Sequence, residues 1–155
     1  MLFRSRDWTT AARLTLHPTK TRLVDSRSEK FAFLGYYFRG TKHWPRDKSR
    51  EKLKETLRAK TKRSTGQSLK CIIQDVNQTL VGWLAYFKHS SYANVFNDHD
   101  EWLRGRLRSI LRKRAGGRGR GRGSDHQKWT ILFFVKHGLF NLKNAHALAV
   151  QSSRR

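Results

Sequence analysis

Basic side chains recur at helical spacing in one stretch of the chain, and this spacing suits phosphate binding. Arg104, Arg108 and Arg112 follow one another every fourth residue, and Lys113 and Arg114 extend the run. Residues four apart on a helix lie on the same side, roughly 6 Å from one another, which is close to the spacing of successive phosphates on a strand. The pattern therefore predicts a helix that follows a nucleic-acid backbone with one face.

Further candidate contacts flank this run. Trp102 lies beside the arginines and could stack on a base, and Arg106 lies on the same predicted helix. Residues 116–123 then form a tract without an apolar residue, in which the arginines are Arg118, Arg120 and Arg122. Such a tract is either a solvated linker or adaptable phosphate-binding material. We favour phosphate contact, because the basic residues meet no acid before Asp125.

Acidic residues are clustered at one place in the sequence, Asp98 to Glu101, with His99 inside the cluster. A metal site competes here with helix capping, and we favour capping. Consecutive residues at a helix start point in different directions, whereas acids there satisfy free N–H groups and the helix dipole. His126 and His137 have no ligand partners at useful spacing. The sequence therefore predicts no metal site.

The composition limits the class of protein. The chain has 155 residues, a net charge of +23, 37% hydrophobic and 12% aromatic residues, which is typical of about one folded domain with a polyanionic partner. Its single cysteine, Cys71, excludes an internal disulfide, and we expect a buried thiol. No stretch has the length and apolarity of a membrane span, and the start MLFRSRDWTT contains no continuous apolar region. We expect a cytoplasmic protein that does not contact membranes.

Apolar periodicity predicts the first elements. Strands are expected near residues 20–25 and 31–38, and the second is apolar on both faces, so we place it inside a larger sheet. Residues 49–62 are expected to form a mostly solvated helix. Ser68 is the expected N-cap of a core helix. The apolar residues that recur at the helical period in this core helix are Leu69, Ile72, Ile73, Val76, Leu80, Trp83, Leu84 and Phe87.

The arginine-rich stretch is predicted to form the next helix, capped by Asn97 or Asp98. Its apolar side consists of Leu103, Leu107, Ile110 and Leu111, so we expect the arginines to cover the opposite, solvent-facing side. Residues 129–142 are apolar enough to fold back onto the helices, and the tail from Gln151 is expected to be loose.

Five segments, in this order, carry a resemblance to a known family. They are LTLHPTKTRLV (14–24), FAFLGYYF (31–38), GWLAYF (82–87), DEWLRGRLRSILRKR (100–114) and KHGLFNL (136–142). Together they resemble the C-terminal part of a group II intron reverse transcriptase, also called an intron-encoded maturase. In that family the first two segments close the polymerase palm. The helices after them form the thumb, or maturase-specific domain X, which holds intron RNA and the template–primer duplex.

The resemblance implies an α+β fold that is mostly α, with short palm-remnant strands followed by a three-helix thumb-like maturase domain. Residues 1–45 would be the palm remnant and 46–115 the helical domain. Residues 116–127 would be a flexible Gly/Arg-rich linker, and 128–155 a C-terminal packing segment and tail. The implied partner is RNA, either structured intron RNA or an RNA/DNA duplex.

The resemblance also bears on catalysis. Family members polymerise DNA with magnesium ions held by an Ala-Asp-Asp turn, and this turn does not occur in the sequence. We therefore expect no enzymatic activity from the chain alone and no cofactor. Lys20 matches a family lysine that lies close to the phosphates of the incoming nucleotide, and it is the one residue with possible catalytic ancestry. The interpretation of Lys20 as an ordinary solvated lysine is equally consistent with the sequence.

Two hypotheses about function follow. In the first, the chain is an RNA-binding maturase-type domain of a truncated intron reverse transcriptase. In the second, it is the C-terminal half of a split or decayed RNA-directed DNA polymerase, which needs a separate palm and fingers polypeptide. A basic protein of ribosomal type would explain the charge but not the ordered series of motifs.

Overall fold

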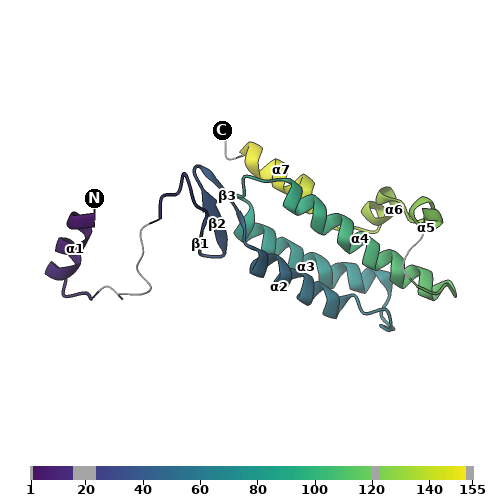
Figure 1. Ribbon diagram of the computed structural model, residues 1–155. Helices are drawn as coiled ribbons and strands as arrows, with labels where there is room; N and C mark the ends of the chain where they lie inside the picture. Colours follow the sequence, from purple (N-terminus) through teal and green to yellow (C-terminus); the bar gives the residue numbers. More distant parts are fainter. Residues whose placement is uncertain (1, 16–23, 120–122, 153–155) are drawn as a thin grey trace.

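The computed structural model describes residues 2–15, 24–119 and 123–152 (Figure 1). Within these ranges the chain forms seven helices and one three-stranded antiparallel sheet. In chain order they are α1 (Leu2–Ala11), β1 (Phe31–Phe33), β2 (Tyr36–Arg39), β3 (Lys42–Pro45), α2 (Asp47–Lys60), α3 (Leu69–Phe87), α4 (Asn94–Arg114), α5 (Gly123–Lys128), α6 (Ile131–Lys136) and α7 (Leu142–Ser152). The fold is α+β and mostly helical, which confirms the predicted fold class.

The long helices α2, α3 and α4 run alongside one another (Figure 1) and share one apolar core. From α2 only Leu53 and Leu57 are buried, four residues apart on one face, as the sequence predicts. α4 contributes Phe96, Leu103, Leu107 and Ile110. Because each helix buries an apolar face against the others, the three helices form a rigid base for the side chains on their outer surfaces.

α3 is the predicted core helix. The Ser68 hydroxyl accepts a hydrogen bond from the Cys71 backbone N–H at 3.2 Å, which confirms the predicted N-cap. The buried residues of α3 are Ile72, Ile73, Val76, Leu80, Leu84 and Phe87. The prediction of a buried thiol at Cys71 is wrong, because Ile72 and Ile73 take the inward positions of this turn and leave the cysteine exposed.

The predicted strand 31–38 is in fact a hairpin. Leu34 (φ 45°) and Gly35 (φ 82°) have left-handed backbone conformations, and the chain reverses there so that β1 pairs with β2. Phe33 and Leu34 at this reversal are 59% and 67% exposed. The prediction of one strand inside a larger sheet is therefore wrong for the described residues. Of the other predicted strand, residues 20–23 lie outside the described ranges, and Val24 and Asp25 are not in a strand.

The sheet is fixed to the end of α3 by two tyrosines. The Tyr36 hydroxyl donates to the Tyr86 carbonyl at 2.6 Å, and the Tyr86 hydroxyl donates to the Leu34 carbonyl at 2.7 Å. Burial, with Tyr86 nearby as a second cause, raises the pKa of Tyr36 to about 12, so its hydroxyl keeps the proton that it donates. The sheet therefore lies at one end of the helices (Figure 1).

The segment after α4 folds back onto the long helices, and α7 packs against both α3 and α4. The Asp100 carboxylate accepts hydrogen bonds from the backbone N–H groups of Leu142 (3.1 Å) and Lys143 (3.0 Å), at the start of α7. The Asn77 amide bonds both the Gly138 carbonyl (2.7 Å) and the Phe140 N–H (2.9 Å). Polar side chains of α3 and α4 thus hold the C-terminal segment in place.

Two boundaries differ from the sequence predictions. α4 begins at Asn94, so Asn97 and Asp98 lie inside the helix and the predicted caps are wrong. The acidic cluster does satisfy free N–H groups, but Asp100 does so for α7, which is distant in sequence. α5 begins at Gly123, so the last residues of the linker predicted at 116–127 are helical.

Candidate nucleic-acid interface

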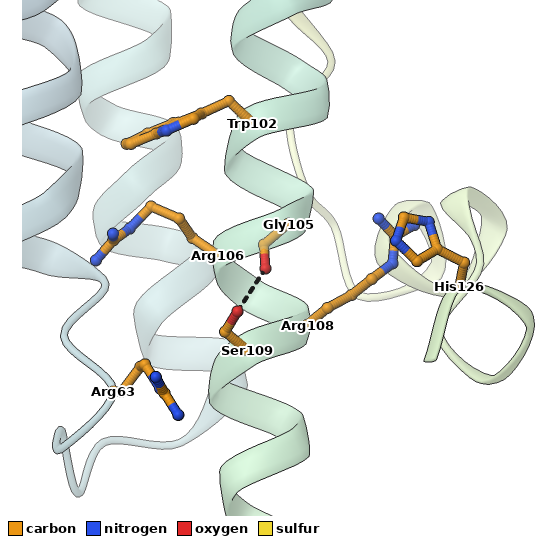
Figure 2. Close-up of a pocket in the computed structure, with 7 residues that line it drawn as sticks. All are labelled: Arg63, Trp102, Gly105, Arg106, Arg108, Ser109 and His126. Atoms are coloured by element: carbon orange, nitrogen blue, oxygen red, sulfur yellow. Dashed lines mark hydrogen bonds between the residues drawn. The ribbon is translucent and has the colours of Figure 1, made fainter. Parts of the chain in front are cut away.

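A basic pocket of about 490 Å³ crosses α4 near its middle (Figure 2). Its lining comes from the loop after α2, from α4 and from α5. The lining residues are Arg63, Trp102, Gly105, Arg106, Arg108, Ser109 and His126. None of these is acidic, so the pocket is suited to an anionic ligand.

Trp102 is surrounded by positive charge. The guanidinium of Arg106 lies 5.4 Å from the centre of the indole, that of Arg58 lies 5.6 Å away, and the Lys54 ammonium lies 6.0 Å away. Indole faces attract cations, which helps to keep these groups together. The nearby carboxylate of Glu51 pairs with Arg58 at 2.5 Å. The cations around Trp102 therefore outnumber the acid that is paired with them.

Internal hydrogen bonds fix the orientation of Arg106. Its Nε donates to the Thr61 hydroxyl at 2.6 Å, and its Nη2 donates to the carbonyls of Thr61 at 2.8 Å and Arg58 at 3.4 Å. Burial, and then the charge of Arg58, lower the pKa of Arg106 from its ordinary value. Arg106 is a rigid part of the pocket wall.

The floor of the pocket is made of small residues of α4. The Ser109 hydroxyl donates to the Gly105 carbonyl at 3.0 Å, the dashed bond in Figure 2. At Gly105 a Cβ atom would meet no heavy atom within 4 Å, apart from its chain neighbours and the backbone of its own helix. The helix backbone is thus open to close approach by a ligand at this point.

Arg104 and Arg108, predicted to face solvent, are buried, with 7% and 5% of their surface exposed. Nε of Arg108 donates to the Trp129 carbonyl at 2.9 Å, and its guanidinium lies 5.5 Å from the Phe134 ring centre. Burial, and then the charge of Arg104, lower the pKa of Arg108 from its ordinary value. The predicted outward-facing arginine stripe is wrong, because the C-terminal segment covers this side of α4.

Arg112 also binds within the protein. Its Nη1 pairs with the Asp125 carboxylate at 2.8 Å, and its Nε donates to the Arg118 carbonyl at 2.9 Å. A Cβ at Gly117 would come within 2.7 Å of the Arg112 side chain, so glycine is required for this turn to close over it. Arg112 therefore connects the end of α4 to α5.

The other residues that the sequence predicts to contact RNA differ in their exposure to solvent. Lys113, Arg114 and Arg118 are exposed, and Arg114 donates to the Gln67 carbonyl. Trp102 is half-buried at the pocket, beside Arg106. Lys20, Arg120 and Arg122 lie outside the described residues.

Sequence reasoning missed several pocket residues, namely Arg63, Gly105, Ser109 and His126. Two of them had a detectable signal. Arg63 belongs to a short basic run before a Ser-Thr-Gly break, and Gly105 is a glycine inside a helical pattern, which often has a packing or functional reason.

The described residues contain no group of three or more His, Cys, Asp or Glu side chains placed to bind a metal ion. Two acids of α4 are already engaged: Asp100 accepts two backbone N–H groups, and Asp98 pairs with Arg50 at 3.5 Å. Magnesium prefers several oxygen ligands in octahedral geometry, and the pocket lining offers mainly nitrogen donors. The residues that line the pocket therefore do not fit a magnesium ion.

A comparison with protein families identifies the domain. Residues 50–129, just over half of the chain, match the model of the group II intron maturase-specific domain. The chain therefore belongs to this family, and the resemblance seen in its sequence is confirmed for these residues. All the residues that line the basic pocket lie inside the matched segment.

No curated protein matches the chain. None of the helices in the described part of the chain has the length and apolarity that a membrane span requires.

Proposed function

We propose that this maturase domain binds structured group II intron RNA, and that its basic pocket is the centre of the contact surface. The observation that carries the proposal is the concentration of Lys54, Arg58 and Arg106 around Trp102, with Arg63 across the pocket. Such a cluster repels itself unless an anion compensates it, and RNA supplies closely spaced phosphates.

Exposed basic residues at the end of α4 extend the proposed surface. Lys113, Arg114 and Arg118 follow the pocket along the chain and are exposed, so we propose them as further phosphate contacts. Arg108 lines the pocket, but we do not count it, Arg104 or Arg112 among the proposed phosphate contacts, because these side chains are buried or bound to groups of the protein.

Filter binding of a folded group II intron RNA at several salt concentrations tests this proposal. If about six phosphates are neutralised, log affinity should fall with log salt with a slope of about −5. Replacing Lys54 and Arg63 together with glutamine should weaken binding and reduce the magnitude of the slope by about 2. Arg39→Gln is the control, since Arg39 is exposed on the sheet at the far end of the helices (Figure 1). Binding that does not depend on salt, or no binding, would remove the proposal.

We further propose that the chain alone does not polymerise DNA, because its sequence contains no Ala-Asp-Asp turn. The alternative function, half of a split polymerase, is favoured by the exposed apolar side chains of Phe33 and Leu34 on the hairpin, which would suit a missing palm. Primer extension distinguishes the two. The chain should be inactive alone, and a gain of activity on adding a separate palm and fingers polypeptide would favour the alternative.

A further inference from the structure

Arg106 is poorly placed to bind a phosphate in a bidentate manner. Two of its nitrogens, Nε and Nη2, already donate to Thr61 and Arg58 inside the protein. Bidentate phosphate binding needs two parallel N–H donors from one guanidinium. These hydrogen bonds hold the guanidinium plane of Arg106 in a fixed orientation at the pocket wall.

The Arg106 guanidinium lies over the indole ring of Trp102. The two groups are 5.4 Å apart, and in Figure 2 the Arg106 side chain lies between those of Trp102 and Arg63. A fixed guanidinium supported by an indole is a stacking surface for a nucleobase, because RNA-binding proteins stack unpaired bases on aromatic rings and on arginine planes. A base on the side of the guanidinium away from the indole would extend the order indole, guanidinium, base.

Gly105 gives a second, independent indication. Glycine inside a helix costs about 1 kcal/mol relative to alanine, and no contact in the described structure requires it here. Attraction of a phosphate does not by itself explain the glycine. Charges attract over several ångströms, so a phosphate need not approach the helix backbone closely. A flat ligand that enters the pocket as far as the α4 backbone requires a residue without a side chain at this position.

We infer that this pocket holds one unpaired RNA nucleotide, with its base stacked on Arg106 over Gly105 and a phosphate near Arg63. The inference rests on the proposed RNA binding and adds the kind of RNA element that the pocket selects. The volume of about 490 Å³ lies in the range of pockets that enclose a small organic ligand. Bases in a continuous duplex stack on each other and cannot present a face to Arg106.

Two synthetic RNA hairpins test the inference. They share one stem, and one of them carries a single bulged 2-aminopurine nucleotide. The wild-type protein should bind the bulged hairpin about tenfold more tightly, since stacking of one base on such a surface gives an effect of this order. Binding should also change the 2-aminopurine fluorescence, which reports stacking of that base directly.

Two variants identify the pocket as the source of the preference. Arg106→Lys keeps the charge and loses the planar face, and Gly105→Leu fills the floor, so each should abolish the preference for the bulge. Matched controls are Arg39→Lys on the sheet and Gly82→Leu in α3. Gly82 is also a helix glycine at which a Cβ would meet nothing within 4 Å, and it does not line the basic pocket. Both controls should keep the preference.

The outcomes separate the inference from the proposed function. Equal affinity of the wild-type protein for the two hairpins would overturn the inference and leave RNA binding standing. A preference that survives in both Arg106→Lys and Gly105→Leu would also overturn it, because the base would then bind elsewhere. Failure to bind either hairpin or intron RNA would overturn both.

Discussion

Two faces of α4 use arginine in opposite ways. On the face covered by the C-terminal segment, Arg108 and Arg112 bind the Trp129 carbonyl and the Asp125 carboxylate. On the pocket face, Arg106 lies beside Trp102, and Gly105 leaves the backbone open. We call these the C-terminal face and the pocket face. The first holds the fold together, although Arg108 also lines the pocket, and the second contains the side of the pocket that we propose contacts a ligand.

The difference shows that helical spacing alone does not identify a phosphate-binding surface. A buried guanidinium must find acceptors within the protein, and the C-terminal segment supplies them. On the pocket face Arg106 also bonds internal acceptors and Arg58 pairs with Glu51, but Lys54, Arg58 and Arg106 gather around Trp102, so positive charge is left over for a partner. Substitutions on the C-terminal face should therefore change stability, whereas substitutions on the pocket face should change RNA affinity.

The largest effect is expected at Asp100, which anchors α7 to the C-terminal face. Asp100→Ala removes the acceptor of two backbone N–H groups, those of Leu142 and Lys143. Each unsatisfied buried donor costs roughly 1 to 3 kcal/mol, so the free energy of unfolding should fall by about 4 kcal/mol. Urea unfolding measures this. The control Asp98→Ala removes an exposed ion pair with Arg50 and should cost under about 1 kcal/mol. Equal effects of the two substitutions would contradict the anchoring role.

Acid should weaken the fold through His99, which is fully buried on α4 against Trp83. Burial, followed by the charges of Arg50 and Lys54, lowers the pKa of His99 from 6.5 to about 4. Between these values the unfolded chain binds more protons, so stability is complete above pH 6.5 and is lost as the pH falls to about 4. The loss from this group should reach about 3 kcal/mol.

Urea unfolding at several pH values between 4 and 7.5 checks this expectation. The substitution His99→Leu should flatten the pH dependence across that window. If the wild-type protein and the variant lose stability in parallel as the pH falls, another group is responsible.

The ion pair between Arg112 and Asp125 should contribute a smaller amount. Its side chains are 15% and 10% exposed, so a double-mutant cycle with alanine at both positions should give a coupling energy of about 1 to 2 kcal/mol. The same cycle on Arg50 and Asp98, which are 28% and 59% exposed, should give less than about 0.5 kcal/mol. A coupling near zero for the first pair would weaken the distinction between the two faces.

The smallest effect is expected on the pocket face and has the opposite sign. Gly105→Ala should stabilise the protein by about 0.5 to 1 kcal/mol, because the added methyl group meets open space and alanine favours the helix. Thermal unfolding measures the gain. A loss of stability would mean that the glycine serves the fold and not the ligand.

The sequence alone predicts those features of the fold that neighbouring residues determine. The apolar period of α3 and its Ser68 cap are encoded in neighbouring residues, and both are confirmed. The prediction of the strand at 31–38 failed where the chain reverses at Leu34 and Gly35, since the apolar pattern continues through the turn. Apolar periodicity does not report a hairpin when both of its strands are apolar.

The candidate site was harder to predict because α4 is covered on two sides. An amphipathic pattern suggests one buried face, so it predicts that the arginines opposite Leu103 and Leu107 face solvent. The acceptors that bury them, Asp125 and the Trp129 carbonyl, lie well beyond the helix in sequence. Arg63 reaches the pocket from a loop, where no periodicity exists to place it. Tertiary packing, not helical spacing, decides which arginine faces a ligand.

One paired measurement tests the central claim most directly: intron RNA affinity and the free energy of unfolding, both determined for Arg63→Gln and for Arg112→Gln. Arg63→Gln should weaken RNA binding about tenfold, as expected for a charged hydrogen bond to phosphate, with no loss of stability. Arg112→Gln should lower stability and leave the affinity of the folded protein unchanged. The reverse pattern, with Arg112→Gln weakening RNA binding and Arg63→Gln weakening only the fold, would contradict the account.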